Sequence, residues 1–312
     1  MISGMGTGEV GAKGNLRSIL AMVASMLIFS VSDVMMKLVG SQMPIGQLLL
    51  LRGAIATVLI LAYARTTGAL AFAHHMLSPK VVWRSLAEAI CSVFYFIALM
   101  RMTLADVAAI SQFTPLVVMA GAALLFGEAV GWRRWSAAVV GFGGVLLIVK
   151  PGTSAFEPVS LVMLGSMAFV AARDLVTRRL QPGIPTVLVT ASAIIAVTLT
   201  GAAMTPFESW HRPTVSEWLM LAISGIAVMT GFMLGIEAMR SGDIGVVAPF
   251  RYSFMVFATL LSFAVFGDVP GGLDWIGIAL ILASGLYMLH RQRVRRAETV
   301  GETTMPARAH RP

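Results

Sequence analysis

An acid and a base stand four residues apart in one apolar run, as Asp33 and Lys37 in the stretch Ser32-Asp33-Val34-Met35-Met36-Lys37. In a helix, residues at this spacing lie on the same face, and the order of acid before base favours their pairing. Such a pair can form a gate or a polar wall along the path of a solute, joined by Arg52 if the next helix folds back beside the first. The alternative is a structural pair that neutralises itself, with Lys37 extended toward lipid head groups.

The same pattern returns in the second half of the chain. Asp174 and Arg178 repeat Asp33 and Lys37 at an interval of 141 positions. Further landmarks recur at an interval of 140, namely Gly127-Glu128 with Gly267-Asp268 and Trp135 with Trp275. We therefore predict two homologous halves. If the two pairs are gates, the first should close one end of the molecule in one state and the second the other end in the other state.

Ionisable and aromatic side chains in other apolar runs extend the candidate site. A charge inside a membrane is costly and usually faces protein or a water-filled cavity, so each such residue is a candidate for the solute path. The predicted substrate path consists of Asp33, Arg52, Glu88, Tyr95, Glu237, Arg251 and Tyr252.

Arg251 follows Pro249 near the start of the ninth apolar run. A guanidinium in that position needs an acceptor, which is Glu88, Glu237 or an anionic or carbonyl-bearing substrate. Pro249 also frees a backbone carbonyl one turn earlier, and broken turns of this kind often line a cavity.

Structural roles compete with transport roles for the two glutamates. Glu88 has Arg84 four residues before it, and Glu237 has Arg240 three residues after it, so each can form an ion pair on its own helix. If transport is coupled to a proton, Asp33, Glu88 or Glu237 would carry it, because these are the carboxylates expected within the helix bundle.

Other chemistry is sparse in the sequence. Tyr95 and Tyr252 can stack on a planar ring of a flavin or an adenine-bearing metabolite, or can pack between helices. Cys91 is the single cysteine, which excludes an intrachain disulfide and a zinc site built on several thiolates. No metal site and no cofactor are predicted, and neither a phosphate-binding Gly-x4-Gly-Lys run nor a His-Glu-x2-His motif occurs. An integral-membrane enzyme is therefore disfavoured.

The elements that must position these residues are membrane-spanning helices. Hydrophobic residues make up 57% of the 312 residues and charged residues only 12%, whereas soluble domains carry roughly a quarter charged residues. Crossing the hydrocarbon core takes about 20 residues of helix. The sequence predicts an all-α polytopic membrane protein with ten such runs, at residues 17–39, 45–64, 81–101, 104–126, 133–150, 158–179, 184–204, 215–238, 244–266 and 273–290.

The distribution of Lys and Arg predicts the orientation. If both termini are cytoplasmic, most basic residues fall in the inner loops and in the tail that begins at Arg291. The net charge of +8 then reflects membrane anchoring, and no nucleic-acid partner is expected. Because each half has an odd number of spans, the halves enter from opposite sides, which is the inverted repeat typical of secondary transporters.

A known family resembles this pattern. Pro115, then Gly127-Glu128, Trp135 and the run Gly141-Phe142-Gly143-Gly144 resemble the EamA repeat of the drug/metabolite transporter superfamily. The predicted division is a cytoplasmic tail (1–16), a first repeat (17–150), a second repeat (158–290) and a basic cytoplasmic tail (291–312). The second copy departs from the pattern, since Asp268 replaces the glutamate and Met255 takes the place of Pro115.

The resemblance implies a ten-helix bundle that moves organic solutes through a central cavity without hydrolysing ATP. A narrower likeness, carried by Phe29-Ser30-Val31-Ser32-Asp33, Arg52 and Ala248-Pro249-Phe250-Arg251-Tyr252, is to S-adenosylmethionine and riboflavin carriers. It implies uptake of one of these compounds across a bacterial inner membrane. The alternatives are an exporter of amino acids or drug-like compounds and a passive facilitator or channel. A monomer and a homodimer are both consistent with the sequence.

Overall fold

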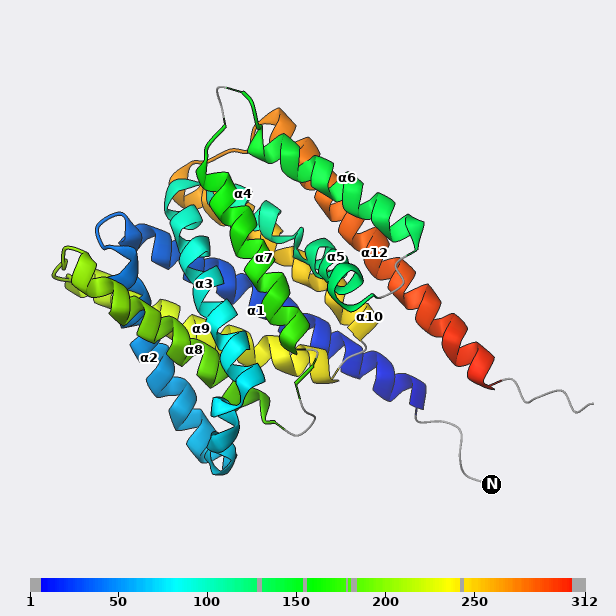
Figure 1. Cartoon of the computed structure of the whole chain (residues 1–312), viewed down its shortest axis with the longest axis horizontal. Helices are drawn as coiled ribbons and strands as arrows, with labels where there is room; N and C mark the ends of the chain where they lie inside the picture. The colour runs from blue at the N-terminus through cyan, green and yellow to red at the C-terminus, as the bar shows by residue number, and fades with distance from the viewer. Residues whose placement is uncertain are drawn as a thin grey trace, which may run out of the picture.

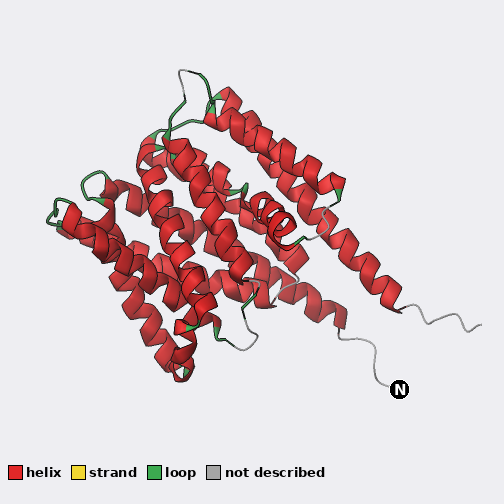
Figure 2. Cartoon of the chain, in the orientation of Figure 1, coloured by secondary structure: helices red, strands yellow, loops and turns green. Residues whose placement is uncertain are grey.

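The computed structural model describes residues 7–304, except residues 128–130, 154–155, 178, 181–183 and 242–243. Every regular element in this part of the chain is a helix (Figures 1 and 2). The first repeat contains α1 (Thr7–Gly40), α2 (Ile45–Thr66), η1 (Ala69–Leu77), α3 (Pro79–Arg101), α4 (Leu104–Ser111), α5 (Thr114–Phe126) and α6 (Trp132–Val149). The second contains α7 (Val159–Thr177), α8 (Thr186–Met204), η2 (Thr205–Phe207), α9 (Val215–Ser241), α10 (Ile244–Val247), η3 (Ala248–Tyr252), α11 (Ser253–Leu261), η4 (Ser262–Phe266) and α12 (Gly272–Thr304).

The helices have the length and composition of membrane spans. Nine segments of the described chain are long and apolar enough to cross a bilayer, and α12 adds a shorter apolar stretch, Gly272–Met288. The predicted all-helical membrane fold is confirmed. Two of the spans are not continuous helices, because α4 and α5 together form one span and the elements from η3 to η4 form another.

Helices of the first repeat pack mainly against helices of the second. The closest neighbours are α1 with α9, α2 with α8, α3 with α7, and α6 with α12. In Figure 1 the blue α1 lies along the yellow α9, and the green α6 lies along the orange and red α12. If each helix is replaced by its equivalent in the other repeat, the pair α1 and α9 becomes the pair α7 and α3. The pairs α2 with α8 and α6 with α12 are unchanged. The arrangement is therefore that of a pseudo-two-fold axis between the repeats.

Two buried hydrogen bonds are equivalent under this exchange. Ser25 on α1 donates to the backbone carbonyl of Gly231 on α9 at 2.7 Å. Ser166 on α7 donates to the carbonyl of Cys91 on α3 at 2.8 Å. Ser166 follows Ser25 by the repeat interval of 141 positions, and Gly231 follows Cys91 by 140. The duplication seen in the sequence is thus preserved in specific contacts.

Two broken helices occupy equivalent places in the repeats. In the first, α4 ends before Gln112 and α5 begins at Thr114, with Pro115 in its first turn. In the second, η3 carries Pro249 in its first turn and leads into α11. Proline in a first helical turn needs no backbone donor, so it permits the chain to restart a helix at a new angle.

Small residues let α6 and α12 approach closely. A Cβ atom added to Gly144 would lie 2.6 Å from the carbonyl oxygen of Gly277, and one added to Gly277 would lie 2.6 Å from that of Gly144. The absence of a side chain at Gly144 and Gly277 is therefore what allows the two helices to pack this closely.

We call the end of the bundle at which α1 finishes the Lys37 end, and the opposite end the Arg251 end. At the Lys37 end, the carboxylate of Glu208, just after η2, accepts hydrogen bonds from the backbone N–H groups of Gly46 at 3.0 Å and Gln47 at 3.3 Å. These are donors that the first turn of α2 leaves without a partner in its own helix. Glu208 therefore fixes the start of α2 against the end of the α8 span.

Candidate substrate cavity

A cavity of about 580 Å³ lies between the two repeats. Its walls come from α1, α2, α3, α6, α7, α12 and the two broken helices, so no single repeat builds it. Its charged lining comprises Asp33, Arg52, Glu88, Arg134, Arg173, Asp174 and Arg251. Cavities of roughly 300–1,000 Å³ hold ligands of drug or metabolite size.

One wall of the cavity is formed by Asp33, Tyr95 and Arg52. Tyr95 on α3 donates a hydrogen bond of 2.6 Å to Oδ2 of Asp33 on α1. Arg52 on α2 lies over the ring of Phe96, 5.1 Å from its centroid, and is attracted electrostatically by Asp33. The predicted approach of Arg52 to Asp33 is therefore seen in the structure, with Tyr95 as the direct partner of the carboxylate.

Asp33 and Lys37 do not neutralise each other. Lys37 donates to the backbone carbonyl of Met102 and lies 5.4 Å from the ring centroid of Phe266. Asp33 instead faces the cavity. The interpretation of this pair as self-satisfied is corrected, because packing against α3 offers each side chain a different partner.

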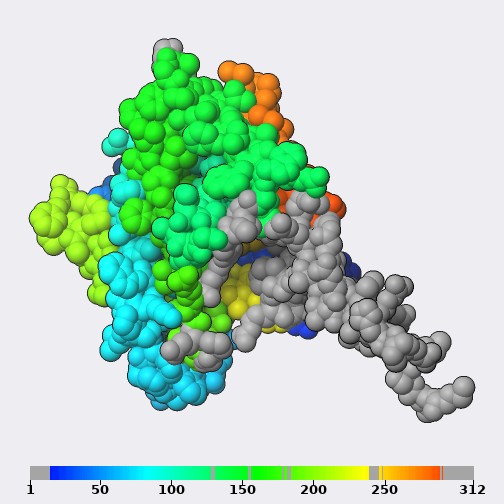
Figure 3. Space-filling model, turned by 45° about the vertical axis from the view of Figure 1, so that its right-hand side comes forward, coloured from blue at the N-terminus to red at the C-terminus, as the bar shows by residue number. Residues whose placement is uncertain are grey.

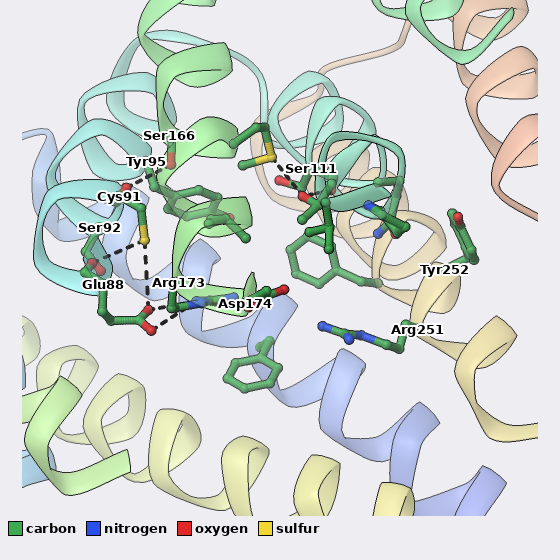
Figure 4. Close-up of a pocket in the computed structure, with 18 of the residues that line it drawn as sticks. Glu88, Cys91, Ser92, Tyr95, Ser111, Ser166, Arg173, Asp174, Arg251 and Tyr252 are labelled. Atoms are coloured by element: carbon green, nitrogen blue, oxygen red, sulfur yellow. Dashed lines mark hydrogen bonds and ion pairs between the residues drawn. The ribbon is translucent and has the colours of Figure 1, made fainter. Parts of the chain in front are cut away.

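The opposite wall is a network centred on Arg173. Its Nη1 lies 3.0 Å from both carboxylate oxygens of Glu88, and its Nε lies 2.9 Å from Oδ1 of Asp174 (Figure 4). Arg84, the partner predicted for Glu88, is more distant, with Nη2 3.6 Å from Oε2. Hydrogen bonds between a guanidinium and a carboxylate are charge-assisted and are roughly twice as strong as neutral ones. Arg173 is thus the principal partner of Glu88.

Arg251 enters the cavity from η3. In Figure 4 its guanidinium points across the cavity toward the side occupied by Arg173 and Asp174. The side chain is exposed, and within the described chain it has no hydrogen bond or ion pair. Neither Glu88 nor Glu237 is its partner. Of the acceptors that the sequence suggested for Arg251, only a substrate is not excluded by these contacts.

Tyr252 follows Arg251 but is turned into the protein. It is 7% exposed, and its hydroxyl packs against Gly285 on α12, where an added Cβ would come within 1.8 Å of it. This contact holds the η3 backbone against α12. Tyr252 lines the cavity with its ring and positions Arg251 beside it.

The lining reaches one end of the bundle. It includes Arg134 at the start of α6, Asp174 near the end of α7 and Met288 near the end of the apolar part of α12, all toward the Arg251 end. Figure 3 shows a recess in the surface between green and yellow parts of the chain.

The Lys37 end is closed by contacts between several helices. Besides the bond from Lys37 to Met102, Lys150 after α6 forms an ion pair of 2.8 Å with Asp274 on α12. Asp106 and Asp268 attract Lys37 electrostatically. No residue of this group lines the cavity. The cavity is therefore separated from the Lys37 end by a cluster of opposite charges.

The remaining sequence candidates are placed differently. Glu237 is exposed on α9 and does not line the cavity, and Arg178 lies outside the described residues. Arg173 is a basic residue inside an apolar run, at the position equivalent to Ser32, and is therefore an ionisable candidate from the sequence. The acid and base pattern pairs its neighbour Asp174 with Arg178, so the sequence does not predict the contacts of Arg173 with Glu88 and Asp174.

Comparison with known proteins gives one family. A sequence model of the EamA-like transporter family matches residues 16–150 and 158–289. A solved crystal structure aligns with 90% of this chain and 98% of its own chain, with a TM-score of 0.61 and 23% identity, which shows a shared fold.

Several characterised relatives are similar over most of their length. The pseudopaline exporter of Pseudomonas aeruginosa is 26% identical over 85% of this chain and 93% of its own. The riboflavin transporter of Vibrio cholerae is 25% identical over 88% and 93%. The S-adenosylmethionine uptake transporter of Rickettsia prowazekii is 22% identical over 90% and 95%.

Proposed function

The chain belongs to the EamA-like transporter family, and we propose that it is a secondary transporter that carries a small organic metabolite through the cavity between its repeats by alternating access. Family membership makes it a multi-pass membrane transporter and not an enzyme. The observation that carries the proposal is the cavity, which reaches the Arg251 end and is separated from the Lys37 end by charged contacts.

The substrate path in this proposal consists of Asp33, Arg52, Glu88, Tyr95, Arg251 and Tyr252, all of which line the cavity. Glu237 is left out because it does not. A coupling proton, if there is one, would then be carried by Asp33 or Glu88.

The gates in this proposal act alternately. In the described state the Lys37 end is closed and the side chain of Asp174 faces the cavity. The exchange of the two repeats would open the Lys37 end and close the Arg251 end, with Asp174 and Arg178 taking the places that Asp33 and Lys37 have in the described state.

Riboflavin or S-adenosylmethionine uptake is the leading specific assignment. Relatives that carry these compounds match most of this chain, and the cavity volume suits molecules of their size. Export is the second candidate, favoured by the equally similar pseudopaline exporter.

The membrane placement extends the same proposal. The positive-inside pattern supports a bacterial inner membrane with both termini, and so the Arg251 end, facing the cytoplasm. Reporter fusions after Lys150 and after Arg291 would test this, since the two sites should report opposite sides of the membrane. The working unit is proposed to be a monomer, because both repeats that enclose the cavity are in one chain.

Proteoliposomes made with purified protein test the function. We expect saturable uptake of labelled riboflavin or S-adenosylmethionine, faster when the vesicles hold unlabelled substrate. An equal rate with empty and loaded vesicles would indicate a channel, because only a site that alternates shows trans-stimulation. Absence of transport for these compounds and for amino acids would contradict the proposal.

A further inference from the structure

The charges around the cavity are not balanced by contacts inside the protein. Three acids line it, and each already has a donor. Tyr95 donates a hydrogen bond to Asp33, and Arg173 donates to both Glu88 and Asp174. The acidic lining is therefore satisfied without a ligand.

The basic lining is not satisfied in the same way. Four arginines line the cavity, one more than the acids. Arg173 is paired with Glu88 and Asp174, and Arg134 has an interaction within the protein. Arg52 lies over the ring of Phe96 and is attracted electrostatically by Asp33, but it has no hydrogen bond within the described chain. Arg251 has neither an ion pair nor a hydrogen bond there.

An arginine held in such a place is suited to bind an anion. A guanidinium offers five N–H donors in a planar fork that matches carboxylate and phosphate oxygens. The contact between Tyr252 and Gly285 fixes the backbone beside Arg251, which reduces the freedom the side chain must lose on binding.

We infer that the transported metabolite carries a carboxylate or phosphate group, that Arg251 binds this group, and that Arg52 attracts it deeper into the cavity. This inference rests on the proposed transport function, and of the two leading substrates it favours S-adenosylmethionine, which has a carboxylate, over riboflavin, which has no acidic group. Phe29, Phe96 and Phe254 line the same cavity and provide apolar surface for the rest of the solute.

A second role for Arg251 has to be separated from this one. Figure 4 shows Asp174 on the side toward which Arg251 points. The two could meet when the Arg251 end closes, and Arg251 would then be needed for every substrate, whatever its charge. The test must therefore compare solutes that differ only in an acidic group.

Matched pairs of labelled solutes provide that comparison. Riboflavin is paired with riboflavin 5′-phosphate, adenosine with adenosine 5′-monophosphate, and tryptamine with tryptophan, and uptake into proteoliposomes is measured for each. The variants are Arg251→Ala and Arg251→Lys. The control is Arg133→Ala, which removes one positive charge from an exposed residue at the same end that stacks on Trp132 and lies outside the cavity.

The parent should prefer the acidic member of at least one pair. Arg251→Ala should reduce that preference about tenfold, which corresponds to about 1.4 kcal/mol. Arg251→Lys should retain part of it, because the charge remains without the fork. Arg133→Ala should leave it unchanged.

Other outcomes overturn the inference. A parent that carries neutral members as well as or better than acidic ones has no anion site, although it would still be a transporter. Equal loss of both members in Arg251→Ala would assign Arg251 to closing the cavity. If nothing is transported, the melting temperature of the purified protein decides. An increase that only acidic members cause and that needs Arg251 would support the anion site and contradict transport, whereas no increase would contradict both.

Discussion

Thr57 and Thr198 lie with their hydroxyl oxygens 3.3 Å apart where α2 crosses α8. They are separated by 141 positions, the interval that relates the two repeats. A residue can contact its own equivalent in this way only near the pseudo-two-fold axis. The axis therefore passes between α2 and α8 at this level.

A contact between two equivalent residues on the pseudo-two-fold axis should be present in both transport states. Exchanging the conformations of the two repeats only replaces each of the two residues with its own partner. We expect a disulfide between Thr57→Cys and Thr198→Cys, in a Cys91→Ser background, to leave transport largely intact. A cross-link between cysteines introduced at Lys37 and Met102 should stop transport until it is removed, because it holds the Lys37 end closed. Uptake is measured for both cross-linked proteins before and after the disulfide is reduced. Full uptake by the protein that is cross-linked at the Lys37 end would contradict alternating access.

The charges at the Lys37 end should hold it closed. We expect Lys37→Ala to increase modification of a cysteine at position 102 by a membrane-impermeant maleimide, since Met102 is 8% exposed in the described state. Arg65→Ala, which changes an exposed residue at the other end of α2, is the matched control. An unchanged labelling rate in Lys37→Ala would remove Lys37 from the gate.

Asp33 should matter more to transport than the hydroxyl of Tyr95. Asp33→Asn removes the charge that faces Arg52, and we expect uptake to fall about tenfold or more, as for an interaction of about 1.4 kcal/mol. Tyr95→Phe removes one hydrogen bond to Asp33 and keeps the ring, so its effect should be smaller. Normal uptake by Asp33→Asn would exclude Asp33 from the path.

Glu88 should be needed for stability because of Arg173. Glu88→Ala removes the two contacts of 3.0 Å between Nη1 of Arg173 and the carboxylate oxygens. Arg173 then stays in the cavity wall with Asp174 as its remaining acidic partner. We expect a loss of about 2–3 kcal/mol in the free energy of unfolding. Arg84→Ala breaks the 3.6 Å contact with Glu88 and the hydrogen bonds of Arg84 to Thr177 and Val189, but it keeps the contact between Glu88 and Arg173, so it should cost less. Thermal unfolding in detergent compares them, and a larger loss in Arg84→Ala than in Glu88→Ala would contradict Arg173 as the main partner of Glu88.

A methyl group added where α6 crosses α12 should destabilise the protein. Gly277→Ala places a Cβ 2.6 Å from a backbone carbonyl of α6, so the helices must separate, at a cost of about 1–3 kcal/mol. Gly143→Ala, on the same helix as the contacted carbonyl, meets no atom within 4 Å and should not destabilise the protein. Melting temperatures test this pair, and similar values for both variants would contradict the close contact.

Much of the fold could be predicted from the sequence. Hydrophobic runs of spanning length are a local property, and the recurrence of Asp33 and Lys37 as Asp174 and Arg178 records the duplication directly. The transporter family follows from the same repeats. Several lining residues, including Asp33, Arg52 and Arg251, were also identifiable, because charges are rare in apolar runs.

The partners of those residues were decided by the tertiary structure. Sequence spacing suggested Lys37 for Asp33 and Arg84 for Glu88, but Tyr95 on α3 and Arg173 on α7 are the closest partners. Spacing along one helix reveals only neighbours on that helix. In this bundle the helices pack against helices that are distant in the sequence, so the partners of Asp33 and Glu88 lie 62 and 85 positions away. The sequence could therefore determine which charges enter the membrane, whereas the packing of the repeats determined that Arg251 alone faces the cavity without an acceptor or an aromatic ring in the described chain.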